Sequence, residues 1–355
     1  MPTLQDLGWN SQREADFAEY RKQGFLPARV AVEHKHRYVL LWDQGELSGE
    51  VTGKLLYLAA ASAELPRVGD WVAVAVFDGE LGIIHAVLPR SSKFSRQTAG
   101  KKTEEQVIAA NIDRVFIVQS LDQNFSLRRL ERYLLMIYEG SALPGVILNK
   151  ADLCPDPEAR IAEVEAIAPG VEVLATSPLS GRGKAELQAL IHPGATCTFA
   201  GSSGVGKSTL INWLFGKELQ ATTEISAWHH KGRHTTTRRE LFLLPGGGIL
   251  IDTPGMRELQ VWHADSGMES TFNDIETLAA NCRFADCTHT SETGCAVLAA
   301  LEAGEIPEDR YQSYLKLQKE LRYLESRDDK DSYLEKKRQD KILHRMIKKM
   351  PNKRK

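Results

Sequence analysis

The stretch that decides the fold is Gly201-Ser202-Ser203-Gly204-Val205-Gly206-Lys207-Ser208. It matches the phosphate-binding P-loop pattern of a glycine, four residues and then Gly-Lys-Ser. The glycines allow consecutive backbone N–H groups to turn toward phosphate oxygens. In this pattern Lys207 reaches the β- and γ-phosphates, and the Ser208 hydroxyl holds Mg²⁺. We therefore expect a phosphate site here.

The flanking residues provide the context that a P-loop needs. Residues 196–200 (TCTFA) predict a buried strand, and residues 209–215 (TLINWLF) predict a helix whose N-terminus adds a positive dipole end beneath the phosphates. A chance glycine-rich turn is the alternative. The strand, loop and helix in sequence favour the phosphate site over it.

Length and composition indicate a globular protein of several domains. The chain has 355 residues, 42% hydrophobic and 26% charged, so we expect two or three domains. No apolar run approaches the roughly 18 residues of a membrane span, and the N-terminus has no signal-peptide pattern. We expect a cytoplasmic protein that does not engage a membrane.

Charge is distributed unevenly along the chain. Residues 336–355 contain ten Lys or Arg and one acid, Asp340, which gives +9 and leaves −11 for the rest of a chain of net charge −2. A basic end on an acidic body predicts a polyanionic partner at the C-terminus, whereas a solvated charged face is the alternative.

The N-terminal part is rich in short β-type runs. Residues 1–22 look helical, and five strands are expected at 29–32, 38–42, 50–52, 71–76 and 81–87. Five strands in about 65 residues fit a small closed barrel such as an OB-fold. Such a barrel either binds an oligonucleotide or only packs on its neighbour, and the sequence leaves both open.

An α/β alternation comes after a basic linker at 90–102. Strands are expected at 114–118, 145–148 and 171–175, with helices at 127–138, 158–166 and 184–191, before the P-loop strand. This rhythm predicts a mostly parallel sheet with helices on both faces.

A base-selecting motif comes directly after the second of these strands. Asn149-Lys150-Ala151-Asp152 has the form Asn-Lys-x-Asp, whose carboxylate can accept hydrogen bonds from guanine N1–H and the exocyclic amine. Adenine offers neither donor in that arrangement, so the motif argues against an ATP-using enzyme. A loop cap is the alternative. Ser177, after the third strand, is a further candidate, through its backbone N–H to guanine O6.

Candidates for γ-phosphate and Mg²⁺ contacts lie after the P-loop. Residues 232–237 (GRHTTT) form a polar loop, in which Thr236 and Thr237 could sense the γ-phosphate; an ordinary loop is the alternative. Asp252, at the end of an expected strand, fits the carboxylate that holds Mg²⁺ through water. Gly255 fits a backbone N–H to the γ-phosphate.

The order of these motifs is unusual, because the base-selecting motif precedes the P-loop by about 50 residues. Permutation preserves a site when each element still reaches its place in the sheet, since chain termini often lie close together. The γ-phosphate segment then ends the domain and must be anchored by the C-terminal residues beyond it.

A cysteine–histidine cluster lies in that C-terminal part. Three of the five cysteines and one histidine lie within fourteen residues: Cys282, Cys287, His289 and Cys295. This density predicts a closed Cys₃His zinc site of structural type rather than a disulfide framework. Three incidental cysteines are the alternative. Beyond residue 307 the pattern predicts helices.

Together these motifs resemble the small-ribosomal-subunit-dependent GTPase family, the YjeQ-like circularly permuted GTPases known as RsgA. The resemblance spans nearly the whole chain, although this N-terminus lacks the basic extension of many members. It implies an N-terminal OB barrel (1–95), a permuted GTPase domain (96–268) and a zinc-binding helical domain with a basic tail (269–355).

The resemblance also implies function: slow GTP hydrolysis to GDP, stimulated by the small ribosomal subunit and assisting its late maturation, with rRNA contact. We expect a monomer. A nucleotide-gated RNA-binding scaffold with incidental hydrolysis is the alternative. The expected GTP-binding residues are Asn149, Lys150, Ala151, Asp152, Ser177, Gly201, Ser202, Ser203, Gly204, Val205, Gly206, Lys207, Ser208, Thr209, Thr236, Thr237 and Gly255. The expected ligands are Cys282, Cys287, His289 and Cys295 for Zn²⁺, and Ser208 and Asp252 for Mg²⁺.

The catalytic group for water is the least determined part. Lys207 and Asp252 are expected to act through phosphate and Mg²⁺. The residue after Gly255 is Met256, whose side chain cannot orient water. His234, beside the loop threonines, is the candidate, because an imidazole exchanges protons at neutral pH. A histidine that contacts only RNA or solvent is the alternative.

Overall fold

The structure is a computed structural model that describes residues 2–34, 37–59, 61–97, 105–216, 239–252, 265–324 and 326. It divides into two compact units. The first comprises Met1–Arg96, Glu105–Gln260 and Ala264–Asn273, and the second comprises Gln97–Glu104, Val261–His263 and Asp274–Lys355. Within the described ranges, no helix is both long and apolar enough to cross a membrane.

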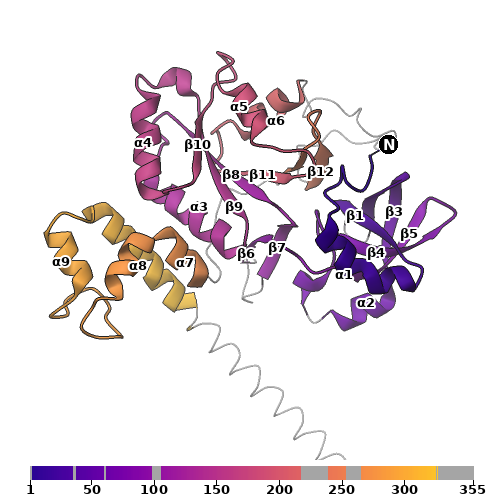
Figure 1. The fold of residues 1–355 in the computed structure, drawn as a ribbon, viewed down its shortest axis with the longest axis horizontal. Coiled ribbons are helices and arrows are strands. Elements are labelled where there is room, and N and C mark those ends of the chain that lie inside the picture. Colours follow the sequence, from indigo (N-terminus) through magenta and orange to yellow (C-terminus); the bar gives the residue numbers. More distant parts are fainter. Residues whose placement is uncertain are drawn as a thin grey trace, which may run out of the picture. The chain divides into compact units, whose positions relative to one another are not determined.

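The N-terminal part of the first unit is a closed five-stranded barrel, as the β-type runs predict (Figure 1). The strand order is β1-β2-β3-β5-β4, and β4 closes the barrel by pairing with β1. β3 and β5 are parallel and the other pairs antiparallel, which is the OB arrangement. The barrel elements are α1 (Ser11–Lys22), β1 (Leu26–Glu33), β2 (Tyr38–Trp42), β3 (Gly45–Val51), α2 (Gly53–Leu58), β4 (Trp71–Phe77) and β5 (Leu81–Val87).

The α/β part of the first unit contains a sheet in the order β10-β9-β8-β11-β13-β12. The first five strands are parallel, and β12 is antiparallel to β13. β12 also pairs with barrel strand β1 at Val32 and Glu240, so barrel and sheet share one hydrogen-bonded ladder. The strands are β8 (Arg114–Ser120), β9 (Leu143–Asn149), β10 (Glu172–Ala175), β11 (Thr196–Ala200), β12 (Glu240–Leu243) and β13 (Ile249–Asp252).

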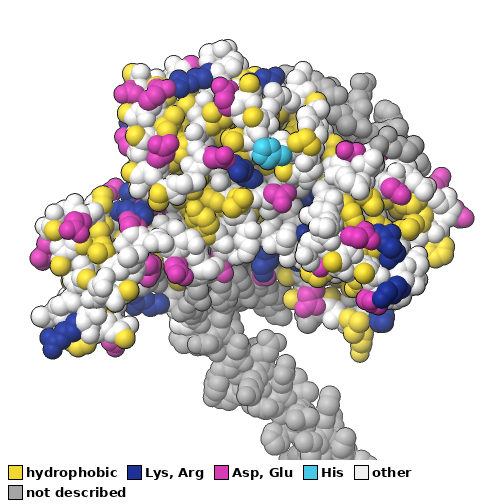
Figure 2. Space-filling model, viewed as in Figure 1, with side chains coloured by type: hydrophobic (Ala, Val, Ile, Leu, Met, Phe, Trp, Pro, Cys, Tyr) yellow, Lys and Arg dark blue, Asp and Glu magenta, His cyan; other side chains and the backbone are white. Residues whose placement is uncertain are grey.

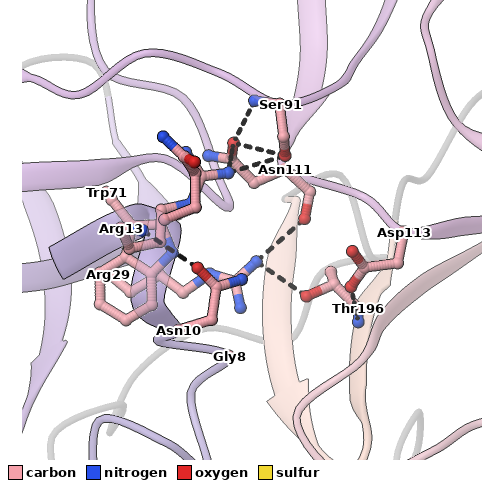
Figure 3. Close-up of a pocket in the computed structure, with 10 residues that line it drawn as sticks. Gly8, Asn10, Arg13, Arg29, Trp71, Ser91, Asn111, Asp113 and Thr196 are labelled. Carbon is pink, nitrogen blue, oxygen red and sulfur yellow. Dashed lines mark hydrogen bonds between the residues drawn. The ribbon is translucent and has the colours of Figure 1, made fainter. Parts of the chain in front are cut away.

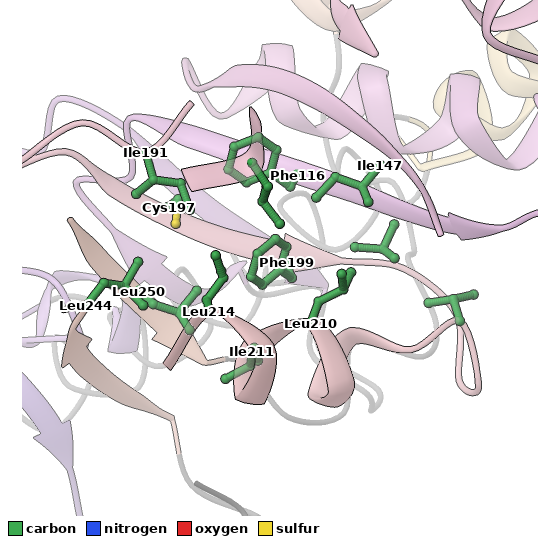
Figure 4. Packing of buried hydrophobic residues seen from close by; sticks show 13 residues of the cluster. Phe116, Ile147, Ile191, Cys197, Phe199, Leu210, Ile211, Leu214, Leu244 and Leu250 are labelled. Atoms are coloured by element: carbon green, nitrogen blue, oxygen red, sulfur yellow. The ribbon is translucent and has the colours of Figure 1, made fainter. Parts of the chain in front are cut away.

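Helices cover the sheet on both sides, as predicted (Figure 1). One group contains α3 and α4, which contact β8, β9 and β10; the other contains α5 and α6, which contact each other. Leu210, Ile211 and Leu214 of α6 pack on Phe116 and Phe199 of the sheet (Figure 4). The helices are α3 (Leu127–Glu139), α4 (Pro157–Ile167), α5 (Lys184–Ala189), α6 (Lys207–Phe215) and α7 (Asp265–Thr271).

One expectation about the connection between barrel and sheet is wrong. The basic stretch predicted as a linker contains a strand, β6 (Lys93–Gln97), that pairs with β7 (Glu105–Ala110) in a small sheet of its own. The lysines and arginines obscured the short β pattern. Lys93 pairs with Glu105, so charge on β6 is matched by charge on β7.

The second unit is helical where it is described. It contains most of α8 (Asn273–Ala279), all of α9 (Ala296–Glu302) and a helical stretch at 308–324. Arg310 binds the Asp274 carboxylate through two nitrogens, and Tyr314 donates to Glu276. These bonds fix the stretch 308–324 against α8.

Arg29 joins the barrel to the α/β sheet. It is 1% exposed, on β1, and its guanidinium donates to the carbonyls of Gly69, Leu7 and Asn111 and to the Thr196 hydroxyl at 2.8 Å. Figure 3 shows Arg29 with Asn111 and Thr196 beside a cavity of about 180 Å³. Burial lowers the pKa of Arg29 to about 10, so it stays charged at neutral pH. One side chain thus anchors the first residue of the P-loop strand to the barrel.

We expect Arg29→Ala to lower the free energy of unfolding by about 3 kcal/mol, because four buried acceptors lose their donor. Denaturant titration measures it. Arg21→Ala is the control, since the Arg21–Glu14 pair is about half exposed and should matter by less than about 1 kcal/mol. Equal, small losses for both variants would show that Arg29 does not hold the junction.

Candidate nucleotide site and metal centre

The predicted nucleotide residues lie at one edge of the parallel sheet. Asn149 ends β9, Thr176 and Ser177 come after β10, Gly201 comes after β11 and Asp252 ends β13. Because these strands are parallel, their carboxyl ends meet at the same edge, where ligands of open α/β sheets bind. The structure therefore brings together motifs that are distant and permuted in the sequence.

The phosphate-binding loop requires glycine at two positions. Gly201 has φ +148° and a Cβ there would collide with the Val118 carbonyl oxygen. Gly206 has φ +96° and a Cβ there would collide with the Asn149 amide. The loop is thus wrapped tightly onto the ends of β8 and β9.

The loop lysine lies against its own loop. Lys207 Nζ donates to the carbonyl oxygens of Gly201 at 2.5 Å and Ser202 at 2.7 Å. Lys207 also begins helix α6, so the loop amides and the helix N-terminus converge on one volume. A bound phosphate would draw the ammonium group away from these carbonyls.

Asn149 ties the base-selecting motif to the P-loop. Its amide nitrogen donates to the Val205 carbonyl at 2.8 Å, and its amide oxygen accepts from the Thr176 hydroxyl at 3.1 Å. Asn149 is 2% exposed, so both bonds are shielded from water. One buried amide therefore joins the ends of β9 and β10 to the loop after β11.

Asp152 and Ser177 lie together, as the sequence predicts for the base pocket. The Ser177 hydroxyl donates to the Asp152 carboxylate at 2.5 Å. The Ser177 backbone N–H donates to the Arg182 carbonyl at 3.0 Å, so guanine O6 would have to compete for that donor. The hydroxyl of Ser177 is the group already directed at the base-selecting carboxylate.

Lys150 is held by a residue that sequence reasoning did not single out. Its ammonium group binds Asp122 at 3.0 Å, and its backbone is left-handed, with φ +59°. Burial raises the pKa of Asp122, but bonds from the Asn124 N–H, Ser120 and Lys150 outweigh it and lower the pKa to about 2. Asp122 therefore remains charged and fixes Lys150 at neutral pH. The motif's spacing gave no signal for this partner, which lies on the loop after β8.

The two predicted Mg²⁺ residues, Ser208 and Asp252, lie at the ends of neighbouring elements. Ser208 is in the first turn of α6, which comes after β11, and Asp252 ends β13, which is paired with β11. The Thr198 hydroxyl donates to the Ile251 carbonyl at 2.8 Å and locks this register. A hydroxyl and a carboxylate are suitable oxygen ligands for Mg²⁺. Other predicted residues, namely His234, Thr236, Thr237, Gly255 and the tail at 336–355, lie outside the described residues.

The predicted cysteine–histidine cluster is assembled in the second unit. The donor atoms of Cys282, Cys287, His289 and Cys295 all lie within 4.8 Å of one another. The distance between the sulfurs of Cys282 and Cys295 is 3.8 Å, and His289 Nδ1 lies 3.6 and 3.4 Å from them. Metal–sulfur bonds of about 2.3 Å in a tetrahedron place sulfurs about 3.8 Å apart. The cluster could therefore hold a metal ion.

The protonation chemistry of the cluster favours metal binding at two ligands. Burial lowers the pKa of His289, so its neutral, ligating form prevails. For Cys282, burial acts to raise the pKa, but hydrogen bonds from the backbone N–H groups of Ala296 and Val297 outweigh it and lower the pKa. Burial and the neighbouring cysteines raise the pKa of Cys287 to about 11, so its proton must leave on metal binding.

Local contacts hold the cluster in shape. His289 has φ +58°, and its carbonyl accepts from the Tyr311 hydroxyl at 2.6 Å. Cys295 caps the N-terminus of α9 by accepting from Leu298 N–H. Glu292 accepts from Thr288 and Ser291 and so closes the loop between the ligands. The ligands therefore sit on a braced loop.

Comparison with known proteins gives consistent matches. The family model described as RsgA GTPase matches residues 87–262. A protein of Opitutus terrae named small ribosomal subunit biogenesis GTPase RsgA is 49% identical over 337 residues and covers 92% of each chain. A protein of the same name from Syntrophotalea carbinolica is 45% identical and covers 90% of this chain and 89% of its own.

Solved structures agree with the sequence relatives. The crystal structure of YjeQ from Thermotoga maritima matches with a TM-score of 0.62 at 27% identity, over 84% of this chain and 98% of that one. YloQ, described as a circularly permuted GTPase, has a TM-score of 0.60 and shares the fold at 22% identity. From the permuted motif order, the assembled site and relatives that match over nine-tenths of its length, the chain belongs to the RsgA family of circularly permuted GTPases.

Proposed function

We propose that this protein hydrolyses GTP to GDP and phosphate and assists the maturation of the small ribosomal subunit, which stimulates the hydrolysis. The bond between Asn149 and Val205 carries the proposal, because it joins a guanine-selecting motif to a phosphate-binding loop in one site. The names of the relatives from Opitutus terrae and Syntrophotalea carbinolica support the choice of the small subunit.

Each part of the site then has a role. Asp152 would accept from guanine, and Lys207 with the loop amides would neutralise the phosphates. Mg²⁺, which Ser208 and Asp252 would hold, would offset charge between the β- and γ-phosphates. Thr236, Thr237 and Gly255 would respond to the γ-phosphate, and His234 would position the attacking water. The subunit would act by ordering the His234 loop.

The basic C-terminal tail is the proposed rRNA contact. On the face in Figure 2, Lys and Arg side chains are interspersed with Asp and Glu over the described residues. The sequence concentrates its surplus positive charge at 336–355. Phosphate contacts of such a segment release counterions and give salt-dependent binding. We propose a monomer that works in the cytoplasm, with domains at 1–95, 96–268 and 269–355.

Zinc is the proposed ion of the cysteine–histidine cluster, in a structural role. Three sulfurs and one imidazole at tetrahedral spacing fit Zn²⁺ and leave no open position for a reacting water. The cluster lies after the γ-phosphate segment in the sequence, so it would anchor the segment's far end.

The direct test is GTP turnover of the purified protein alone, with small subunits and with large subunits. We expect small subunits to raise turnover by roughly 10²-fold, the scale of one positioned catalytic group. Large subunits are the control and should leave it unchanged. Turnover that ignores both subunits, combined with GTP-dependent subunit binding, would instead favour a nucleotide-gated scaffold.

Base selection is tested with Asp152→Asn. We expect GTP affinity to fall roughly 30-fold and preference to shift toward xanthosine triphosphate, whose base has a carbonyl where guanine has an amine. Nucleotide titration measures both. Asp156→Asn is the control, because Asp156 caps α4 and asparagine caps equally well. If Asp152→Asn binds GTP as the parent does, Asp152 is not in the base site.

Metal content is tested by elemental analysis of the purified chain. We expect about one zinc per chain, lost in Cys287→Ser and kept in Cys154→Ser, whose cysteine lies outside the cluster. Cys287→Ser should lose small-subunit binding before nucleotide binding. Metal-free protein that still binds the subunit normally would contradict the anchoring role.

A further inference from the structure

We propose that Tyr133 is a positioning residue for the phosphate-binding loop: from helix α3, its phenol holds the Ser202 side chain and thereby the peptide that receives Lys207. The inference rests on the proposed function, since it assigns a role in binding the phosphates of GTP. Neither the motif pattern nor its spacing includes a residue of α3.

The contact is buried and fixed in protonation. Tyr133 is 2% exposed, and its hydroxyl is hydrogen-bonded to the Ser202 side chain. Burial is the main cause that raises the pKa of Tyr133 to about 12. The phenol therefore keeps its proton throughout the neutral range and can act as a constant hydrogen-bonding partner of the loop.

Ser202 is held from two sides. Its side chain meets Tyr133, and its carbonyl oxygen accepts from Lys207 Nζ at 2.7 Å. When phosphate draws Lys207 away, the second restraint is lost and the first remains. Tyr133 would then preserve the loop geometry in which the amides after Gly201 face the phosphates.

Helix α3 is a firm support for this contact. Leu130, Leu134 and Ile137 are buried beneath it. At its C-terminal end, Glu139 accepts from the Ser266 hydroxyl at 2.9 Å and from the Gly267 N–H at 3.2 Å. Helix α7, to which these residues belong, packs closely, because a Cβ at Gly267 would collide with the Leu135 carbonyl oxygen. Tyr133 therefore projects from a helix fixed along its length.

The role predicts a loss specific to phosphate-bearing ligands. A general structural defect would weaken binding of the base as well, whereas a misplaced Ser202 peptide affects only the phosphate cradle. GTP and GDP should bind less well, while guanosine, which has no phosphate, should compete for the base pocket as before.

The experiment measures the affinities of Tyr133→Phe for GTP, GDP and guanosine by titration and competition. We expect about fivefold weaker GTP and GDP binding, the scale of one neutral hydrogen bond, with unchanged guanosine binding. Ser202→Ala should show the same loss, and the double variant no more than either single one. Tyr138→Phe is the matched control on α3, because burial is the sole cause of the raised pKa of Tyr138.

Tyr133→Phe with parental GDP affinity would overturn the proposal, and so would equal losses for GDP and guanosine. Additive losses in the double variant would show that Tyr133 and Ser202 act separately, which also contradicts it. Failure of the parent protein to bind GTP or GDP at all would instead refute the proposed function.

Discussion

The buried amide of Asn149 is the interaction on which the nucleotide site depends. It is the point where the end of β9, the Thr176 hydroxyl after β10 and the Val205 carbonyl of the P-loop meet. Unpaired buried groups are costly, so this amide holds the base-selecting loop and the phosphate loop in one relative position. The absence of a side chain at Gly206 is what lets the amide approach so closely. The chemistry of two motifs thus reduces to one shared hydrogen-bond junction.

Permutation is compatible with this site because the site depends on strand positions rather than on chain order. β8, β9, β10, β11 and β13 are parallel, so every loop at their carboxyl ends reaches the same edge. The barrel is tied to the same framework, through the β1–β12 pairing and through Arg29 on Thr196 at the start of β11. A force on the barrel would therefore be felt by the strand that carries the P-loop, which suits a protein proposed to couple a large partner to nucleotide turnover.

Much of this architecture can be predicted from local sequence. The barrel strands, the P-loop strand at 196–200 and the cysteine–histidine cluster are where periodicity and spacing place them. Long-range partners were not predictable. Arg29 contacts Thr196, 167 positions away, and Asp122 contacts Lys150, 28 positions away. Nothing in the neighbourhoods of Arg29, Asp122 or Tyr133 marks these roles. The β6–β7 pair was missed for a related reason, since its strands are stabilised by cross-strand pairing of charged residues rather than by an apolar pattern.

The most direct test of the central claim, that permuted motifs form one guanine-nucleotide site, is a crystal structure with GDP and Mg²⁺. The account predicts the guanine edge on the Asp152 carboxylate and the β-phosphate within loop 201–208. Lys207 should have left the carbonyls of Gly201 and Ser202, and the Asn149–Val205 bond should remain intact. A nucleotide whose base lies away from Asp152, or whose phosphates lie outside that loop, would contradict it.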